Sequence, residues 1–125
     1  TVQFLSMMDQ VLAQLGHAGI DVDYRFVRLL CSRHDTSNPS ESMVIRIMEE
    51  AFGAALLPVA VLDSAEISHA SLRMMTVFEL DKPIGTARTH KRCKRNLEEA
   101  LGQVEQLLRR GWNRAAVAEE LADVA

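Results

Sequence analysis

Two short apolar runs constrain the fold of this chain more than any other feature of its sequence. The first, at residues 24–32 (YRFVRLLCS), is rich in aromatic and branched residues, which is typical of a strand buried on both faces of a sheet. The second, at residues 56–61 (LLPVAV), also indicates a strand, although Pro58 removes one backbone donor and confines it to an edge or delays its start. A helical pattern separates the two runs, so the sequence predicts a strand–helix–strand unit with parallel strands.

A sheet of two parallel strands is too small to bury both of its faces. The chain is long enough for one modest domain. The pattern therefore predicts a single partial domain over residues 1–125, which further strands or a partner chain would complete. Residues 1–66 would form an α/β portion that contains the strand–helix–strand unit, and residues 67–125 a helical C-terminal portion.

Apolar residues at helical spacing predict helices around these strands, at residues 4–15, 44–52, 72–78, 93–108 and 117–124. Asn38 or Ser40 is expected to cap the helix that separates the two strands. Gly111 and Asn113 interrupt the pattern before the last helix, so the sequence predicts two helices there and not one.

The charge of the chain is unevenly distributed. The net charge is −3, yet five of the 14 Lys and Arg residues lie between Arg88 and Arg95, a stretch that contains no acid. The remaining 9 Lys and Arg face 17 Asp and Glu. A basic stretch on an acidic body indicates an anionic partner. The two cysteines belong to no CxxC pair, the four histidines show no metal-binding spacing, and His69 is expected at the surface.

Three segments taken in order, YRFVRLLCSRHD, PSESMVIRIMEEAFG and VLDSAEISHASLRMMTVFEL, carry a resemblance to a known family. They are similar to the C-terminal half of ParA-type partition ATPases, which include the RepA proteins of repABC replicons and SopA-like proteins. The resemblance runs from about Val2 to Arg110. It implies the C-terminal half of a Rossmann-like P-loop fold with a deviant Walker A loop, that is, a short parallel sheet with flanking helices and a helical C-terminus.

The catalytic segments of that family are missing from this chain. No GxxxxGK[ST] motif occurs, and Gly85-Thr86-Ala87-Arg88 lacks the second Gly and the Lys that cradle phosphates. We therefore expect no ATP hydrolysis by the chain alone and assign it no catalytic residue. The resemblance implies ATP and Mg²⁺ in the intact protein, and no cofactor requirement for this portion.

The resemblance also implies which residues approach the nucleotide base. Ser32 and Arg33 match the loop on one side of the base, and Asp63 and Ser64 match the loop that closes the other side. Ligands of parallel sheets bind at the carboxyl ends of strands, which is consistent with these positions. The alternative is that these residues form solvated loops with surface charges.

Family members bind DNA without sequence preference through basic residues in this region, and five residues match it in place and charge: Arg88, Lys91, Arg92, Lys94 and Arg95. All but Lys94 follow the i, i+3, i+4, i+7 spacing of one helix face, which would contact several phosphates. The alternative is a solvated helix start, although positive charge near a helix N-terminus opposes the macrodipole.

The resemblance further implies a homodimer of the intact protein, a ParB-type centromere-binding partner and a cytoplasmic, nucleoid-associated location without a membrane partner. Two other functions remain open. Residues 113–125 resemble the first helix of a helix-turn-helix regulator, although the chain stops where a recognition helix would start. A protein-interaction module with an exposed sheet edge is the third hypothesis.

Overall fold

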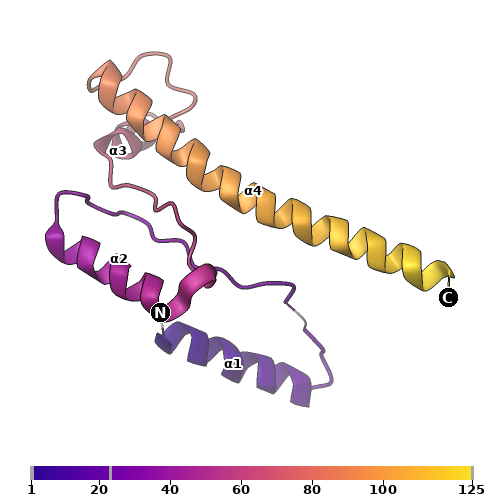
Figure 1. Ribbon diagram of the computed structural model, residues 1–125. Helices are drawn as coiled ribbons and strands as arrows, with labels where there is room; N and C mark the ends of the chain where they lie inside the picture. Colours follow the sequence, from indigo (N-terminus) through magenta and orange to yellow (C-terminus); the bar gives the residue numbers. More distant parts are fainter. Residues whose placement is uncertain (1, 23, 125) are drawn as a thin grey trace.

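The computed structural model describes residues 2–22 and 24–124, with side chains described up to residue 113 and at residues 121 and 122. The elements are α1 (Val2–His17), α2 (Pro39–Phe52), the 3₁₀ helix η1 (Gly53–Ala55), α3 (Ala65–Leu72) and α4 (Ala87–Val124). Figure 1 shows α4 as a long helix that starts beside α3, with α2 and α1 on the same side of it as α3 in this view.

The predicted α/β fold is wrong, because no strand forms within the described residues. The two apolar runs are extended and parallel, but they meet only at two isolated bridges, Leu29 with Leu56 and His34 with Leu62. The Leu57 N–H donates to the Leu29 carbonyl, and the Val61 N–H donates to the Cys31 carbonyl, both at 2.8 Å. The chain is therefore predominantly helical, and the predicted Rossmann-like sheet is absent from the described part.

The register between the two extended segments explains why they fail to form a ladder. Between those hydrogen bonds the second segment advances four residues, from 57 to 61, while the first advances two, from 29 to 31. Pro58, which lacks an N–H, lies within the longer stretch and removes a donor there. Tyr24, predicted to be buried in a strand, is 51% exposed. A pair of segments without further strands has no ladder on either side to hold it regular.

The predicted helix between the extended segments is confirmed as α2, and so are its predicted N-cap and its predicted last residue. The Asn38 side chain accepts a hydrogen bond from the Ser40 N–H and acts as the N-cap, and Pro39 occupies the first turn, where its missing N–H has no helical partner. Gly53 ends α2 with φ +51°, in the left-handed region that favours glycine. The predicted helix at residues 4–15 is also confirmed, as α1.

The buried core is small and lies between α3, residues 73–86 and the first half of α4. Its members are Ala70, Val77, Leu80 and Cys93, with Leu97 packed against them. The predicted helix over residues 72–78 is wrong, because the helix occurs earlier: the Ser64 hydroxyl accepts from the Glu66 N–H and starts α3. That helix ends at Leu72, which is 81% exposed.

α4 is one helix of 38 residues, so the predicted interruption at Gly111 and Asn113 is wrong. Gly111 lies where an extended segment approaches the helix. A Cβ at this position would meet the Phe26 ring at 3.4 Å, and the Arg25 side chain donates to the Gly111 carbonyl at 3.0 Å. A Cβ would make an ordinary van der Waals contact there, so the approach of the first extended segment does not require the glycine, and the glycine does not end the helix.

Two amide side chains of α4 hold the second extended segment. The Leu62 N–H donates to Asn96 Oδ1, and Asn96 Nδ2 donates to the Ala60 carbonyl, both at 2.9 Å. About two turns further along α4, on the same face, Gln103 Oε1 accepts a hydrogen bond from the Val59 N–H at 3.4 Å. These bonds satisfy backbone groups that a neighbouring strand would otherwise pair. The sequence analysis assigned no role to either amide.

We expect Asn96→Ala to destabilise the chain by roughly 1–3 kcal/mol, because it leaves the half-buried Leu62 N–H and Ala60 carbonyl without their partners. Chemical denaturation followed by circular dichroism measures the change. Asn113→Ala is the matched control, since Asn113 lies in the same helix with an exposed side chain. Equal destabilisation by the two substitutions would contradict the assigned role of Asn96.

The chain exposes far more surface than a compact monomer of its mass. Its accessible surface is 9918 Å² for 13.9 kDa, whereas a compact monomer of this mass exposes about 6,700 Å². Apolar side chains on α1 and α2, such as Phe4, Val44 and Ile47, contribute to the excess because each is about half exposed. The described helices bury little of their apolar surface against one another.

Candidate nucleic-acid interface

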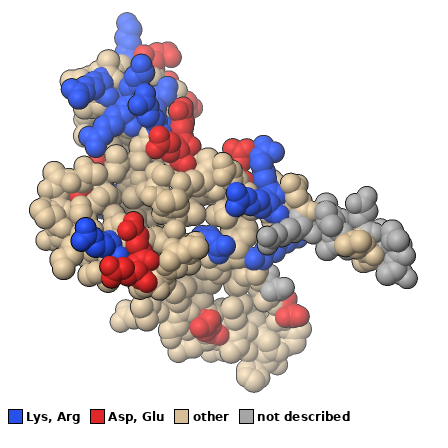
Figure 2. Space-filling view, viewed as in Figure 1, with Lys and Arg blue, Asp and Glu red and all other residues tan. Residues whose placement is uncertain are grey.

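The basic stretch forms the first turns of α4. Its five cationic residues are Arg88, Lys91, Arg92, Lys94 and Arg95, and the first turn of the helix contains no acid. Figure 2 shows Lys and Arg side chains gathered over the end of the molecule where α4 begins. All of them except Lys94 are exposed, so a ligand can reach them from solvent.

The structure distributes these cations over more than one surface. Lys91, Lys94 and Arg95 line a surface pocket of about 460 Å³, whereas Arg92 lines another pocket of about 430 Å³ on the side of α3. Arg88 lines neither pocket. Lys94 is half-buried, and its Nζ lies 5.8 Å from the centre of the Phe78 ring, a cation–π contact. The predicted ridge is therefore a curved basic surface around the helix.

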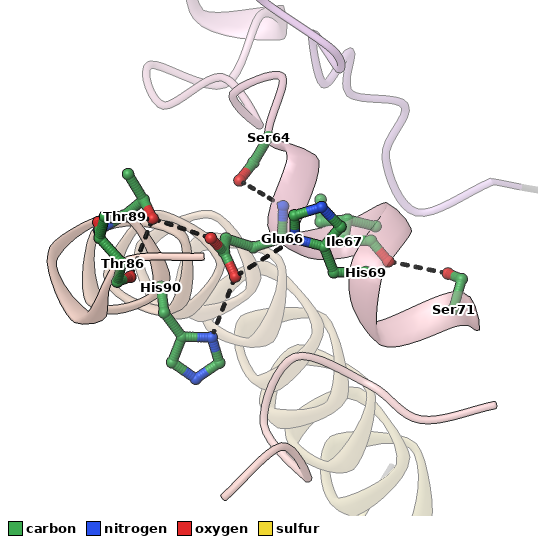
Figure 3. A network of polar contacts seen from close by, with 8 residues as sticks. All are labelled: Ser64, Glu66, Ile67, His69, Ser71, Thr86, Thr89 and His90. Atoms are coloured by element: carbon green, nitrogen blue, oxygen red, sulfur yellow. Dashed lines mark hydrogen bonds and ion pairs between the residues drawn. The ribbon is translucent and has the colours of Figure 1, made fainter. Parts of the chain in front are cut away.

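A buried carboxylate holds the start of α4 against α3. The Glu66 side chain, on the first turn of α3, accepts a hydrogen bond from Thr89 Oγ1 at 2.8 Å (Figure 3). The Thr89 N–H in turn donates to Thr86 Oγ1 at 3.2 Å, which caps the first turn of α4. Glu66 is only 3% exposed, so this contact lies inside the molecule. It places a negative charge beside a helix start that is otherwise basic.

Two histidines face the other oxygen of the same carboxylate. Glu66 Oε2 lies 3.6 Å from His90 Nδ1 and 4.0 Å from His69 Nδ1, and all three atoms are buried without a hydrogen-bond partner. No pattern in the sequence indicated this cluster, and His69, which was expected at the surface, is half-buried. Glu66 and His90 are far apart in the sequence, so only the packing of α3 on α4 brings them together. Within the described residues, no group of three or more His, Cys, Asp or Glu side chains suits a metal ion.

We expect Gly85→Ala to displace this cluster. A Cβ at residue 85 would overlap the Glu66 carboxylate and approach Thr89 Oγ1 at 3.4 Å. Because Glu66 is buried and bonded to Thr89, its displacement should destabilise the chain by roughly 1–3 kcal/mol. Thermal unfolding followed by circular dichroism measures the change.

Gly102→Ala is the control for that substitution, because a Cβ at residue 102 meets nothing within 4 Å and lies inside α4. We expect it to stabilise the chain by about 1 kcal/mol through helix propensity. A neutral or stabilising effect of Gly85→Ala would show that the Glu66 side chain can move away freely. It would contradict the inference that burial and the bond to Thr89 hold Glu66 in place.

The two pairs of residues predicted to contact a nucleotide base line different pockets, although their segments lie side by side: the Asp63 N–H donates to the His34 carbonyl at 2.9 Å. Ser32 and Arg33 line a pocket of about 470 Å³ between the first extended segment and α2, whereas Asp63 and Ser64 line the pocket beside α3. The Ser64 hydroxyl is already used as the cap of α3. Neither pocket is lined by a GxxxxGK[ST] loop, since the sequence contains none.

Hydrogen bonds from neighbouring residues lower the pKa of two exposed carboxyl groups. The Ser37 hydroxyl and the Ser37 N–H donate to Asp35 at 2.7 and 2.9 Å and lower its pKa. The Thr76 N–H donates to Glu79 at 2.6 Å and lowers the pKa of that group. Both carboxylates hold turns, at the rim of the α2 pocket and in the segment before α4. Neither lies among the cations of α4.

No family model matches the chain. It is similar to two proteins that share the name "Putative replication protein A", one from Rhizobium rhizogenes (25% identical over 112 residues, 90% of this chain) and one from Sinorhizobium fredii strain NBRC 101917 / NGR234 (25% identical over 116 residues, 93% of this chain). The chain spans 28% of the length of each. Among the described residues, no helix is both long and apolar enough to cross a membrane.

Proposed function

We propose that this chain belongs to a protein that replicates or partitions a DNA replicon, and that the start of α4 contacts the DNA backbone. The observation that carries the proposal is the basic surface at the start of α4, on a body in which acids outnumber bases. The similarity to two proteins named as replication proteins supports the same biological setting. We infer a plasmid setting from the resemblance to the RepA proteins of repABC replicons.

The side chains of this surface suit phosphate groups and not base edges. Arg88, Lys91 and Arg95 project from the outer side of α4, opposite the buried Cys93 and Leu97. Lys and Arg side chains that neutralise phosphates release condensed counterions, so such binding depends steeply on salt. No Phe, Tyr or Trp lies within residues 88–95, and the Phe78 ring beside this surface is in contact with Lys94. We therefore expect binding without sequence preference.

The finer properties that the ParA resemblance implies are proposals for the whole protein. They are ATP and Mg²⁺ binding, homodimerisation, association with the nucleoid and recognition of a ParB-type partner. Because the chain spans 28% of its relatives' length and lacks a phosphate-binding motif, the nucleotide site would depend on a region outside this sequence. The large exposed apolar surface supports packing against such a region.

A helix-turn-helix regulator is less consistent with the structure. Residues 113–124, which resemble the first helix of that motif, continue α4 without a turn. A protein-interaction module is favoured by one observation, the apolar surface of α1 and α2. Partner binding without affinity for DNA would favour that function over the one proposed.

The test is the binding of the chain to a random-sequence duplex, measured by fluorescence anisotropy over a salt series. We expect binding at low salt that falls steeply as salt rises and is equal for several unrelated duplexes. Preference for one sequence would favour a regulator. Absence of binding at low salt would contradict the proposed role of α4.

A further inference from the structure

The basic pocket on α4 contains a histidine that the proposed function does not use. His90 lines this pocket together with Lys91, Lys94 and Arg95, and the pocket holds one acid, Glu98. The segment before the helix contributes Pro83. The pocket is therefore cationic before His90 carries any charge, and the histidine is 8% exposed, which leaves an edge of its ring at the pocket wall.

The opposite side of the same imidazole faces the buried carboxylate of α3. His90 Nδ1 lies 3.6 Å from Glu66 Oε2, and Thr89 Oγ1 fixes the other carboxylate oxygen at 2.8 Å. In Figure 3 the second ring nitrogen of His90 points away from Glu66. A neutral ring that carries its proton on the nitrogen facing Glu66 presents an acceptor at the other nitrogen.

We propose that His90 makes this pocket a proton-dependent site for a phosphodiester group of nucleic acid, an inference that rests on the proposed DNA contact. When His90 is neutral, the lone pair of its outer nitrogen repels a phosphate oxygen. When His90 takes up one proton, both ring nitrogens carry an N–H: Nδ1 faces Glu66 Oε2 at 3.6 Å, and Nε2 can donate to the phosphate. The step is the uptake of one proton from solvent, with no other bond made or broken.

The charged groups around His90 make its uptake of a proton depend on whether the pocket holds an anion. Glu66 faces it from α3, with His69 on the same carboxylate oxygen; Lys91, Lys94, Arg95 and Glu98 surround it on α4. The three cations oppose a further positive charge in the empty pocket, and an anion in the pocket removes that opposition. Phosphodiester binding should therefore promote proton uptake by His90, and a lower pH should tighten binding by linkage.

The test compares the affinity of the full chain for a random-sequence duplex at about pH 6 and about pH 8, on either side of the ordinary imidazole range. We expect roughly fivefold tighter binding at the lower pH. His90→Asn keeps a polar group where Nδ1 faces Glu66 but cannot take up a proton, so it should remove most of this ratio. His17→Asn, on the exposed end of α1, is the control and should keep it.

A second arm uses dimethyl phosphate, whose charge is constant over this range, and follows the His90 ring signals of the full chain by NMR. We expect them to shift with dimethyl phosphate at about pH 6 and not at about pH 8. If the duplex does not bind at either pH, the proposed DNA contact is wrong. The dimethyl phosphate experiment then decides by itself whether the His90 pocket binds a phosphodiester group. An unchanged pH ratio in His90→Asn, or no ring shift at either pH, would overturn the proposal.

Discussion

Replacing Arg88, Lys91, Arg92 and Arg95 together with alanine should reduce the affinity of the chain for a random-sequence duplex by at least roughly a hundredfold at low salt. These are the exposed cations of the first turns of α4, and Lys94 is left in place because it is half-buried against Phe78. The physical reason is that each lost phosphate contact retains about one condensed counterion on the DNA.

The salt dependence of binding separates this role from a general loss of positive charge. We expect the slope of log affinity against log salt to become less steep by about 3–4 in the quadruple variant. The matched control replaces four other exposed cations with alanine: Arg28, Arg46, Arg109 and Arg110. It changes the net charge equally and should lower the slope much less. Equal losses in the two variants would show that net charge, and not the basic surface of α4, determines binding.

The largest effect on stability is expected from Leu80→Ala. Leu80 is 6% exposed and belongs to the small core that joins residues 73–86 to α4. Truncating a buried leucine to alanine removes apolar contacts and leaves a cavity, which destabilises proteins by about 2–5 kcal/mol. Because this chain has few buried residues, a loss of that size is a large share of its free energy of unfolding. Chemical denaturation followed by circular dichroism measures it.

Leu72→Ala is the control, because it removes the same atoms from a side chain that is 81% exposed at the end of α3. We expect a change within about 0.5 kcal/mol. The pair also tests the corrected fold of this region, since the sequence predicts a helix at residues 72–78 with Leu72 on its apolar stripe. A larger loss from Leu72→Ala than from Leu80→Ala would contradict the observed core.

Local signals in the sequence predicted several helices correctly. Asn38 and Gly53 bound α2 because a side-chain acceptor and a left-handed glycine act on the residues next to them. The apolar stripe predicted over residues 93–108 is buried at Cys93 and Ala100, whereas Leu101 and Leu108 of the same stripe are exposed. Charge patterning likewise located the basic residues of the candidate interface, since that information lies within eight consecutive positions. Each of these features depends on residues that are close together in the sequence, so the sequence alone is enough to predict it.

Gly111 shows where such signals mislead. The sequence predicts a helix end at this glycine, but it lies inside α4, where the Arg25 side chain donates to its carbonyl. The two extended segments show the same limit, because strand-like residues form a sheet only when enough partners pair with them. Within the described part of the chain they meet at two bridges, and the side chains of Asn96 and Gln103 satisfy the backbone of the second segment.

The sequence alone determined the helical periodicity of α1, α2 and α4, the caps of α2 and the concentration of positive charge between Arg88 and Arg95. Only the tertiary structure decided that Glu66 lies against Thr89 and His90, that four of the five basic residues divide between two pockets, and that no sheet forms in the described residues. The physical reason is range: periodicity, caps and charge density act within a few residues. The Glu66 cluster and the pairing of extended segments join residues more than 20 positions apart, which the fold alone brings together.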